Sequence, residues 1–189
     1  MDKKILEIEK ERLRLEYSFD MGINFADRVI QMTGELEDQG YFDRIDAALS
    51  EMERDSKKGI TIRINSPGGS VYEALAILGR LKNSKCHITT EGYGCIMSAA
   101  SLILAAGDKR KMSKYAQFMH HEAQYGLAGR HSAIQDEVAQ IEREEHMWSR
   151  WMAEFTNKDA QFWYNHGKRK DFHMFAEECL ATGIVDEII

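Results

Sequence analysis

The sequence predicts an α/β protein with a parallel or mixed sheet, because strand and helix patterns alternate along the chain. Residues 42–52 place apolar side chains three or four positions apart, which is the spacing of one helix face. In residues 60–64 isoleucine alternates with polar residues, as in a strand, and residues 71–81 return to helical spacing. Parallel strands joined by right-handed crossovers place their functional loops beyond the carboxyl ends of the strands.

The other elements continue this alternation. Apolar, β-branched stretches predict further strands at residues 28–33, 87–91 and 117–120. A turn is expected at Gly92-Tyr93-Gly94, followed by a buried helix of small residues over 96–106. Three loops are then candidates for a functional site: 66–70, 92–98 and 121–130.

Two charged segments lie outside this pattern. Residues 1–16 carry a weak helical stripe and predict an arm or a short helix. Residues 132–155 lack glycine and proline and predict one long exposed helix. Its second half contains Met147, Trp148, Trp151 and Met152, which need cover either from the subunit's own core or from another subunit.

The composition narrows the class of protein. A chain of 189 residues that is 43% apolar can bury a single core. The net charge of -6 argues against nucleic acid as a main partner. The three cysteines are too few and too scattered for a disulfide framework or a zinc motif, which favours a reducing compartment. No signal-like or membrane-spanning apolar run is found, so a cytoplasmic protein is expected.

The predicted loops contain residue types suited to acyl transfer by a serine. Ser98 stands where a glycine turn leads into a helix, so the backbone N–H of Ala99 and the helix dipole can stabilise negative charge there. Gly69 can supply a second N–H donor, and Pro67 stiffens the turn before it. A histidine and a carboxylate are also needed, and His120, His121 and Asp171 are candidates.

Each of these features also has a purely structural interpretation. Ser98 lacks the usual nucleophile elbow and could be a small helix-packing residue. The His120–His121 pair could face solvent, and Asp171 could balance the basic residues before it. By itself, Ser66-Pro67-Gly68-Gly69 is a turn.

Taken in order, the motifs resemble the proteolytic subunit of the Clp protease over about residues 27–189. The most specific of them is the glycine loop Ile64-Asn65-Ser66-Pro67-Gly68-Gly69-Ser70-Val71. The first strand, the nucleophile segment, the histidine segment and the carboxylate segment of that family are matched by residues 27–34, 94–107, 118–122 and 171–186.

The resemblance implies a Ser-His-Asp triad of Ser98, His121 and Asp171. The serine four residues after the family's glycine is the nucleophile, which selects Ser98 rather than Ser101. His121 is selected over His120 in the same way. The N–H groups of Gly69 and Ala99 would form the oxyanion hole, and neither a metal nor a cofactor is required.

The resemblance further implies a ClpP/crotonase-like fold with a protruding handle that includes the helix 132–155. The substrate would be an extended polypeptide paired with the chain after Gly69 and after His121. This assigns substrate binding to Gly68, Ser70, Val71, Ala123, Gln124 and Tyr125. The subunits would form a homo-oligomer of rings with seven subunits each, as in the family, and two rings would stack as a tetradecamer.

Departures from the family pattern refine this expectation. The short interval from Ser98 to His121, and Ala123 where a proline is usual, indicate a phage-type member. Residues 1–26 do not resemble the segment that helps to dock an ATP-driven unfoldase, so such a partner stays an open question. We therefore treat 1–26 as an arm and 27–189 as the peptidase domain.

Two other functions remain open at this point. A crotonase-like enzyme acting on an acyl-CoA would use the same N–H donors without the triad. A ring-forming subunit with an unaligned triad would be catalytically silent.

Overall fold

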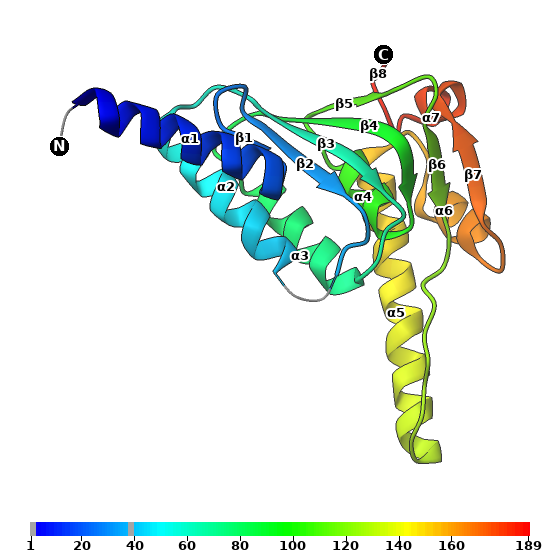
Figure 1. Ribbon diagram of the computed structural model, residues 1–189. Helices are drawn as coiled ribbons and strands as arrows, with labels where there is room; N and C mark the ends of the chain where they lie inside the picture. The colour runs from blue at the N-terminus through cyan, green and yellow to red at the C-terminus, as the bar shows by residue number, and fades with distance from the viewer. Residues whose placement is uncertain (1–2, 38–39) are drawn as a thin grey trace.

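The computed structural model describes residues 3–37 and 40–189, and the strands in this part of the chain form one sheet (Figure 1). The strands are β1 (Ile23–Asn24), β2 (Val29–Thr33), β3 (Ile60–Ser66), β4 (Ile88–Met97), β5 (Lys109–Met112), β6 (Gln117–His120), β7 (Phe172–Phe175) and β8 (Glu187–Ile188). The helices are α1 (Lys3–Met21), α2 (Tyr41–Asp55), α3 (Val71–Lys82), α4 (Ala99–Ala105), α5 (His131–Phe155), α6 (Ala160–Gly167) and α7 (Ala176–Thr182). The predicted α/β order is confirmed.

The sheet is mostly parallel and divides at β4. Its main order is β1-β2-β3-β4-β5-β8, in which only the short β1 runs antiparallel to its neighbour. The first half of β4, Thr89–Gly92, pairs with β5, and the second half, Cys95–Met97, pairs with β6. Strand β7 adds to the far side of β6 in antiparallel orientation. The carboxyl ends of β4 and β6 therefore lie side by side.

The core lies between the sheet and the helices on one of its faces. Helices α2 and α3 run along this face, with α4 beside them at β4 (Figure 1). Ile60, Ile62 and Ile64 of β3 are at most 1% exposed, which confirms the alternation read from the sequence. The predicted apolar face of α2 is likewise buried through Ile45, Leu49 and Met52. Helix α4 is buried along its whole length.

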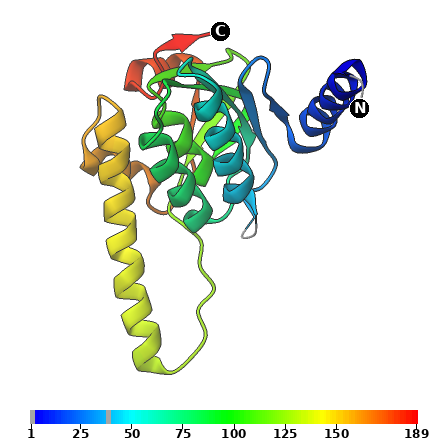
Figure 2. The same ribbon diagram turned by 90° about the vertical axis from the view of Figure 1, so that its left-hand side faces the viewer.

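Residues 121–155 form an arm that projects from this body, which we call the handle. The chain from 121 to 130 runs outward without regular structure, turns, and returns as α5 (Figures 1 and 2). The outer half of α5 is largely exposed. The inner half packs on its own subunit, because Met152 is fully buried and Trp148 and Trp151 pack against the core. Intramolecular packing therefore covers most of the apolar end that the sequence analysis identified.

Two local predictions differ from the structure. The turn expected at Gly92-Tyr93-Gly94 is part of β4, which continues to Met97, and the helix expected from 96 begins only at Ala99. The pairing register between β3 and β4 shifts near these glycines, so they are accommodated within the strand. Gly94 has a φ of 58°, and the Asn65 side chain accepts a hydrogen bond from the N–H of Cys95 at 3.1 Å.

The N-terminal segment is more ordered than the sequence indicated. Helix α1 extends to Met21, beyond the stretch 1–16, and stands apart from the body (Figure 2). Strand β1 then pairs with β2, so that residues 23 and 24 join the sheet. The boundary at residue 27 stays a prediction.

Candidate active site

Ser98 lies at the junction of β4 and α4. It is the residue before the first turn of α4 and has a φ of 51° and a ψ of -125°, a backbone conformation that is unfavourable for a side chain other than glycine. Its N–H donates to the carbonyl oxygen of Met119 in β6 at 2.9 Å. The carbonyl oxygen of Ser98 accepts from the N–H of Ser101 at 2.9 Å, so hydrogen bonds hold the strained backbone on both sides of the side chain.

His121 and Asp171 are positioned by the strands next to β4. His121 directly follows β6, and Asp171 directly precedes β7. Because β6 and β7 are antiparallel and His120 is opposite Phe172, the next residue outward on each strand is His121 and Asp171 respectively. The sheet thus brings Ser98, His121 and Asp171, which are distant in sequence, to the same end of three neighbouring strands.

The distances between these side chains define a chain of contacts. His121 Nε2 lies 2.8 Å from Ser98 Oγ, which is a hydrogen bond, and His121 Nδ1 lies 3.4 Å from Asp171 Oδ1. With the proton on Nδ1 facing the carboxylate, Nε2 is free to accept the serine proton. The contact to Asp171 is longer than a good hydrogen bond, and such contacts commonly tighten when substrate binds. The Asp171 side chain is 57% exposed, so packed protein does not fix the position of its carboxylate.

His120 has a different environment. It is 4% exposed, its Nε2–H donates to the carbonyl oxygen of Trp163 at 3.2 Å, and its ring meets the Trp163 ring edge to face. Burial, as the largest cause, lowers the pKa of His120 to about 4. His120 is therefore a neutral core residue that supports α6, and His121 is the histidine that reaches Ser98.

The glycine loop lies against the start of α4. A Cβ atom at Gly68 would come within 2.6 Å of Ser98 Cβ and 2.9 Å of the Ala99 nitrogen, so only glycine allows this approach. Leu36 forms a parallel bridge with the loop, in which its N–H donates to Gly68 and its carbonyl accepts from Ser70. In that pattern the N–H of Gly69 points away from Leu36. The N–H groups of Gly69 and Ala99 therefore belong to two backbone segments that meet beside Ser98.

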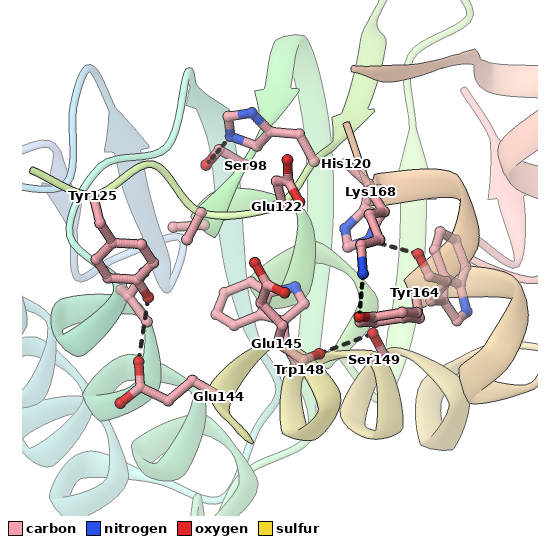
Figure 3. Close-up of a pocket in the computed structure, with 16 residues that line it drawn as sticks. Ser98, His120, Glu122, Tyr125, Glu144, Glu145, Trp148, Ser149, Tyr164 and Lys168 are labelled. Atoms are coloured by element: carbon pink, nitrogen blue, oxygen red, sulfur yellow. Dashed lines mark hydrogen bonds between the residues drawn. The ribbon is translucent and has the colours of Figure 1, made fainter. Parts of the chain in front are cut away.

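A pocket opens next to Ser98 and His121, between the root of the handle and α6 (Figure 3). It contains about 590 Å³ not filled by protein, part of it open to solvent. Of the predicted substrate-binding residues, Val71, Ala123 and Tyr125 line it, whereas Gly68, Ser70 and Gln124 do not. Ser70 instead caps α3 by accepting from the N–H of Glu73 at 3.4 Å.

The far wall of this pocket was not predicted from the sequence. That wall consists of Glu144, Glu145, Trp148, Ser149, Trp163, Tyr164 and Lys168. Most of these residues come from α5 and α6, which are brought next to Ser98 and His121 only by the tertiary fold. A stretch as charged as 142–145 has the pattern of a solvated helix face, so the sequence contained no signal for it.

Comparison with known proteins identifies the family. The family model of the Clp protease matches residues 16–189, nearly the whole chain. The chain belongs to the Clp protease family. The Clp protease proteolytic subunit 2 of Chlamydia trachomatis is 32% identical over 165 residues, covering 86% of this chain and 81% of the relative. Subunit 1 of Rhodococcus jostii is 30% identical, with coverage of 87% and 76%, and the subunit of Pleurastrum terricola is 31% identical, with 86% and 83%.

Membership in the Clp protease family makes this chain a serine-type peptidase with the family's α/β fold. The expected resemblance is confirmed, while the phage-type refinement stays a prediction. A peptidase family favours the hydrolase over the acyl-CoA alternative. In the described ranges, none of the helices of this Clp protease family member is long and apolar enough to cross a membrane.

Proposed function

We propose that this chain is a serine endopeptidase in which Ser98, His121 and Asp171 act together on a peptide bond. The observation that carries the proposal is the 2.8 Å hydrogen bond between His121 Nε2 and Ser98 Oγ. Ser98 Oγ attacks the scissile carbonyl while His121 takes its proton, and His121 then protonates the leaving amine. Water repeats the sequence on the acyl-enzyme, and Asp171 holds the imidazolium that forms in each half.

The negative charge of the tetrahedral intermediate needs donors at the same place. The N–H of Ala99, in the first turn of α4, and the N–H of Gly69, turned away from Leu36, are the two donors that we assign. The fit between Gly68 and the start of α4 keeps them at a fixed separation. Fixed donors of this kind contribute about 3 kcal/mol each to lowering the barrier.

The extended chain of the handle is the feature that favours an oligomer. In the part of the chain that the structure describes, residues 123–129 make no backbone–backbone hydrogen bond, although they lie extended beside α5 (Figure 2). An extended segment with free N–H and C=O groups is a template for another strand. We assign its inner part to the substrate and its outer part to a second subunit, within a ring-shaped homo-oligomer.

The proposed mode of substrate binding also bears on the partner that this enzyme needs. A substrate laid out as a strand must be unfolded, and the relatives are named ATP-dependent, so we propose an ATP-driven partner for folded substrates but not for short peptides.

We also propose that the enzyme is cytoplasmic, because its free thiols, at Cys86, Cys95 and Cys179, stay reduced in that compartment.

Labelling with a fluorophosphonate probe tests the triad. One serine should be labelled, and Ser98→Ala should abolish both labelling and hydrolysis of a peptide reporter, a loss of about 10⁴-fold or more. His121→Ala should be nearly as damaging, while Ser101→Ala, the matched serine control, should keep its labelling. Intact labelling in Ser98→Ala would refute the proposal, and no labelling of the wild type would favour the silent subunit.

Light scattering measured alongside hydrolysis tests the oligomer. Because His121 begins the handle, we expect dissociated subunits to lose activity as the handle loses its partner. A stable monomer with full activity would remove that coupling, and a single ring with full activity would remove the need for stacked rings.

A further inference from the structure

The pocket beside Ser98 combines aromatic walls with an excess of negative charge. Trp148, Trp163 and Tyr164 supply the rings. Three carboxylates also line the pocket: Glu122, Glu144 and Glu145. Lys168 is the one cation among its lining residues. Figure 3 shows the Glu145 side chain above the Trp148 ring and pointing toward Glu122 across the open space.

The three carboxylates differ in their partners. Glu122 accepts from the backbone N–H of Arg169 at 3.1 Å. Glu144 accepts from Tyr125 Oη at 3.2 Å and from Gln140 Nε2 at 2.9 Å. Within residues 3–37 and 40–189, the Glu145 carboxylate has no hydrogen bond and no ion pair. Lys168 donates to Tyr164 Oη at 2.6 Å instead.

The charge of Glu145 is therefore poorly compensated. Burial is the largest cause that raises its pKa, the nearby Glu122 raises it further, and Lys168 only partly opposes them. A cation brought into the pocket would stabilise the charged form of this carboxylate and so compensate for the water that it has lost through burial. The surrounding rings and Val71 would cover the methylene groups that carry such a cation, and indole faces attract ammonium and guanidinium groups.

We propose that Glu145 selects a lysine or arginine side chain on the substrate residue whose carbonyl Ser98 attacks. This inference rests on the proposed peptidase function and specifies its substrate class. The position follows from the lining, since Ser98 and Ala99 belong to the same pocket as Glu145. The side chain attached next to the attacked carbonyl is the one that can enter a pocket at that point.

Reporter peptides that differ at this one position provide the test. They carry lysine, norleucine, which has a similar chain without the ammonium group, or glutamate. For the wild type we expect kcat/KM for lysine to exceed that for norleucine about tenfold, which corresponds to about 1.4 kcal/mol. Glu145→Gln keeps the shape and removes the charge, so the ratio should fall to about one.

The matched control is Glu137→Gln, the same change at an exposed position of α5 outside the pocket, and it should keep the tenfold ratio. Glu145→Lys should instead prefer the glutamate peptide over the lysine peptide. Fluorophosphonate labelling of Ser98 verifies that each variant retains a folded site.

The outcomes separate the two proposals. Hydrolysis without a preference for lysine in the wild type, or a lysine preference that survives in Glu145→Gln or Glu145→Lys, would overturn the role of Glu145 alone. No hydrolysis of any peptide, together with no labelling of Ser98, would overturn the peptidase function and this inference with it.

Discussion

Lowering the pH from about 7.5 to about 5 is expected to destabilise this protein by about 2 kcal/mol through His120 alone. His120 is 4% exposed and donates to the Trp163 carbonyl, so the folded protein holds it neutral. Its ordinary pKa of 6.5 falls to about 4 in the folded state, chiefly through burial. In the unfolded chain the same side chain takes up a proton below its ordinary pKa.

The sign follows from where the proton binds. Above the unfolded pKa both states carry a neutral His120, and its contribution to stability is complete. As the pH falls toward the folded pKa, only the unfolded state is protonated, and the free energy of unfolding decreases. The decrease reaches about 2 kcal/mol at about pH 5 and about 3 kcal/mol once the pH is below both pKa values.

Urea unfolding of the wild type and of His120→Gln at the two pH values measures this term. Glutamine can still donate to the Trp163 carbonyl but does not titrate. The wild type should lose about 2 kcal/mol more than the variant over that interval, with both proteins at one concentration because assembly shifts apparent stability. Equal losses in the two proteins would refute the assignment of His120 as a buried neutral residue.

Three further substitutions test the active site and the neighbouring helix α4. Gly68→Ala should slow fluorophosphonate labelling of Ser98 at least about 100-fold, because the new Cβ displaces the Ser98 side chain, whereas Gly79→Ala, where the space is open, should label normally. Equal labelling of the two variants would contradict the fit of the glycine loop. Ser101→Ala removes a buried hydroxyl that has no partner among the described residues, so urea unfolding should show no loss and a gain of up to about 1 kcal/mol. Asp171→Asn should lower kcat for a peptide reporter by about 10²- to 10⁴-fold with little change in KM, and a rate near that of the wild type would exclude a role in holding His121.

The order of elements could be predicted because local pattern and tertiary burial agree in the body of the protein. The isoleucines of β3 alternate since alternate residues of that strand face the helix layer, and the apolar positions of α2 repeat for the same reason. The course of β4 could not be predicted. Gly92 and Gly94 have the local signature of a turn, but the strand continues because Ile96 fills the space at Gly92 and Asn65 hydrogen-bonds beyond Gly94.

The candidate site likewise has a part that could be predicted from the sequence and a part that could not. The resemblance of the ordered motifs to the Clp proteolytic subunit selected Ser98, His121 and Asp171, and their side chains lie in contact in the structure. What holds His120 in the core could not be predicted, because the Trp163 carbonyl that accepts from its Nε2–H lies on α6 and gives no local sign in the sequence. The acidic wall of the pocket depends on how α5 packs, and a charged helix face looks the same whether it meets solvent or a substrate.

The pairing of β6 with β7 also bears on how this enzyme can diversify. His121 and Asp171 are the first residues beyond an antiparallel ladder, so backbone hydrogen bonds fix their separation. The chain between them, including α5 and α6, leaves the sheet at one of these positions and returns at the other. Insertions, deletions or exchanged segments in that excursion can therefore alter the pocket and the partners while the histidine and the carboxylate keep their spacing.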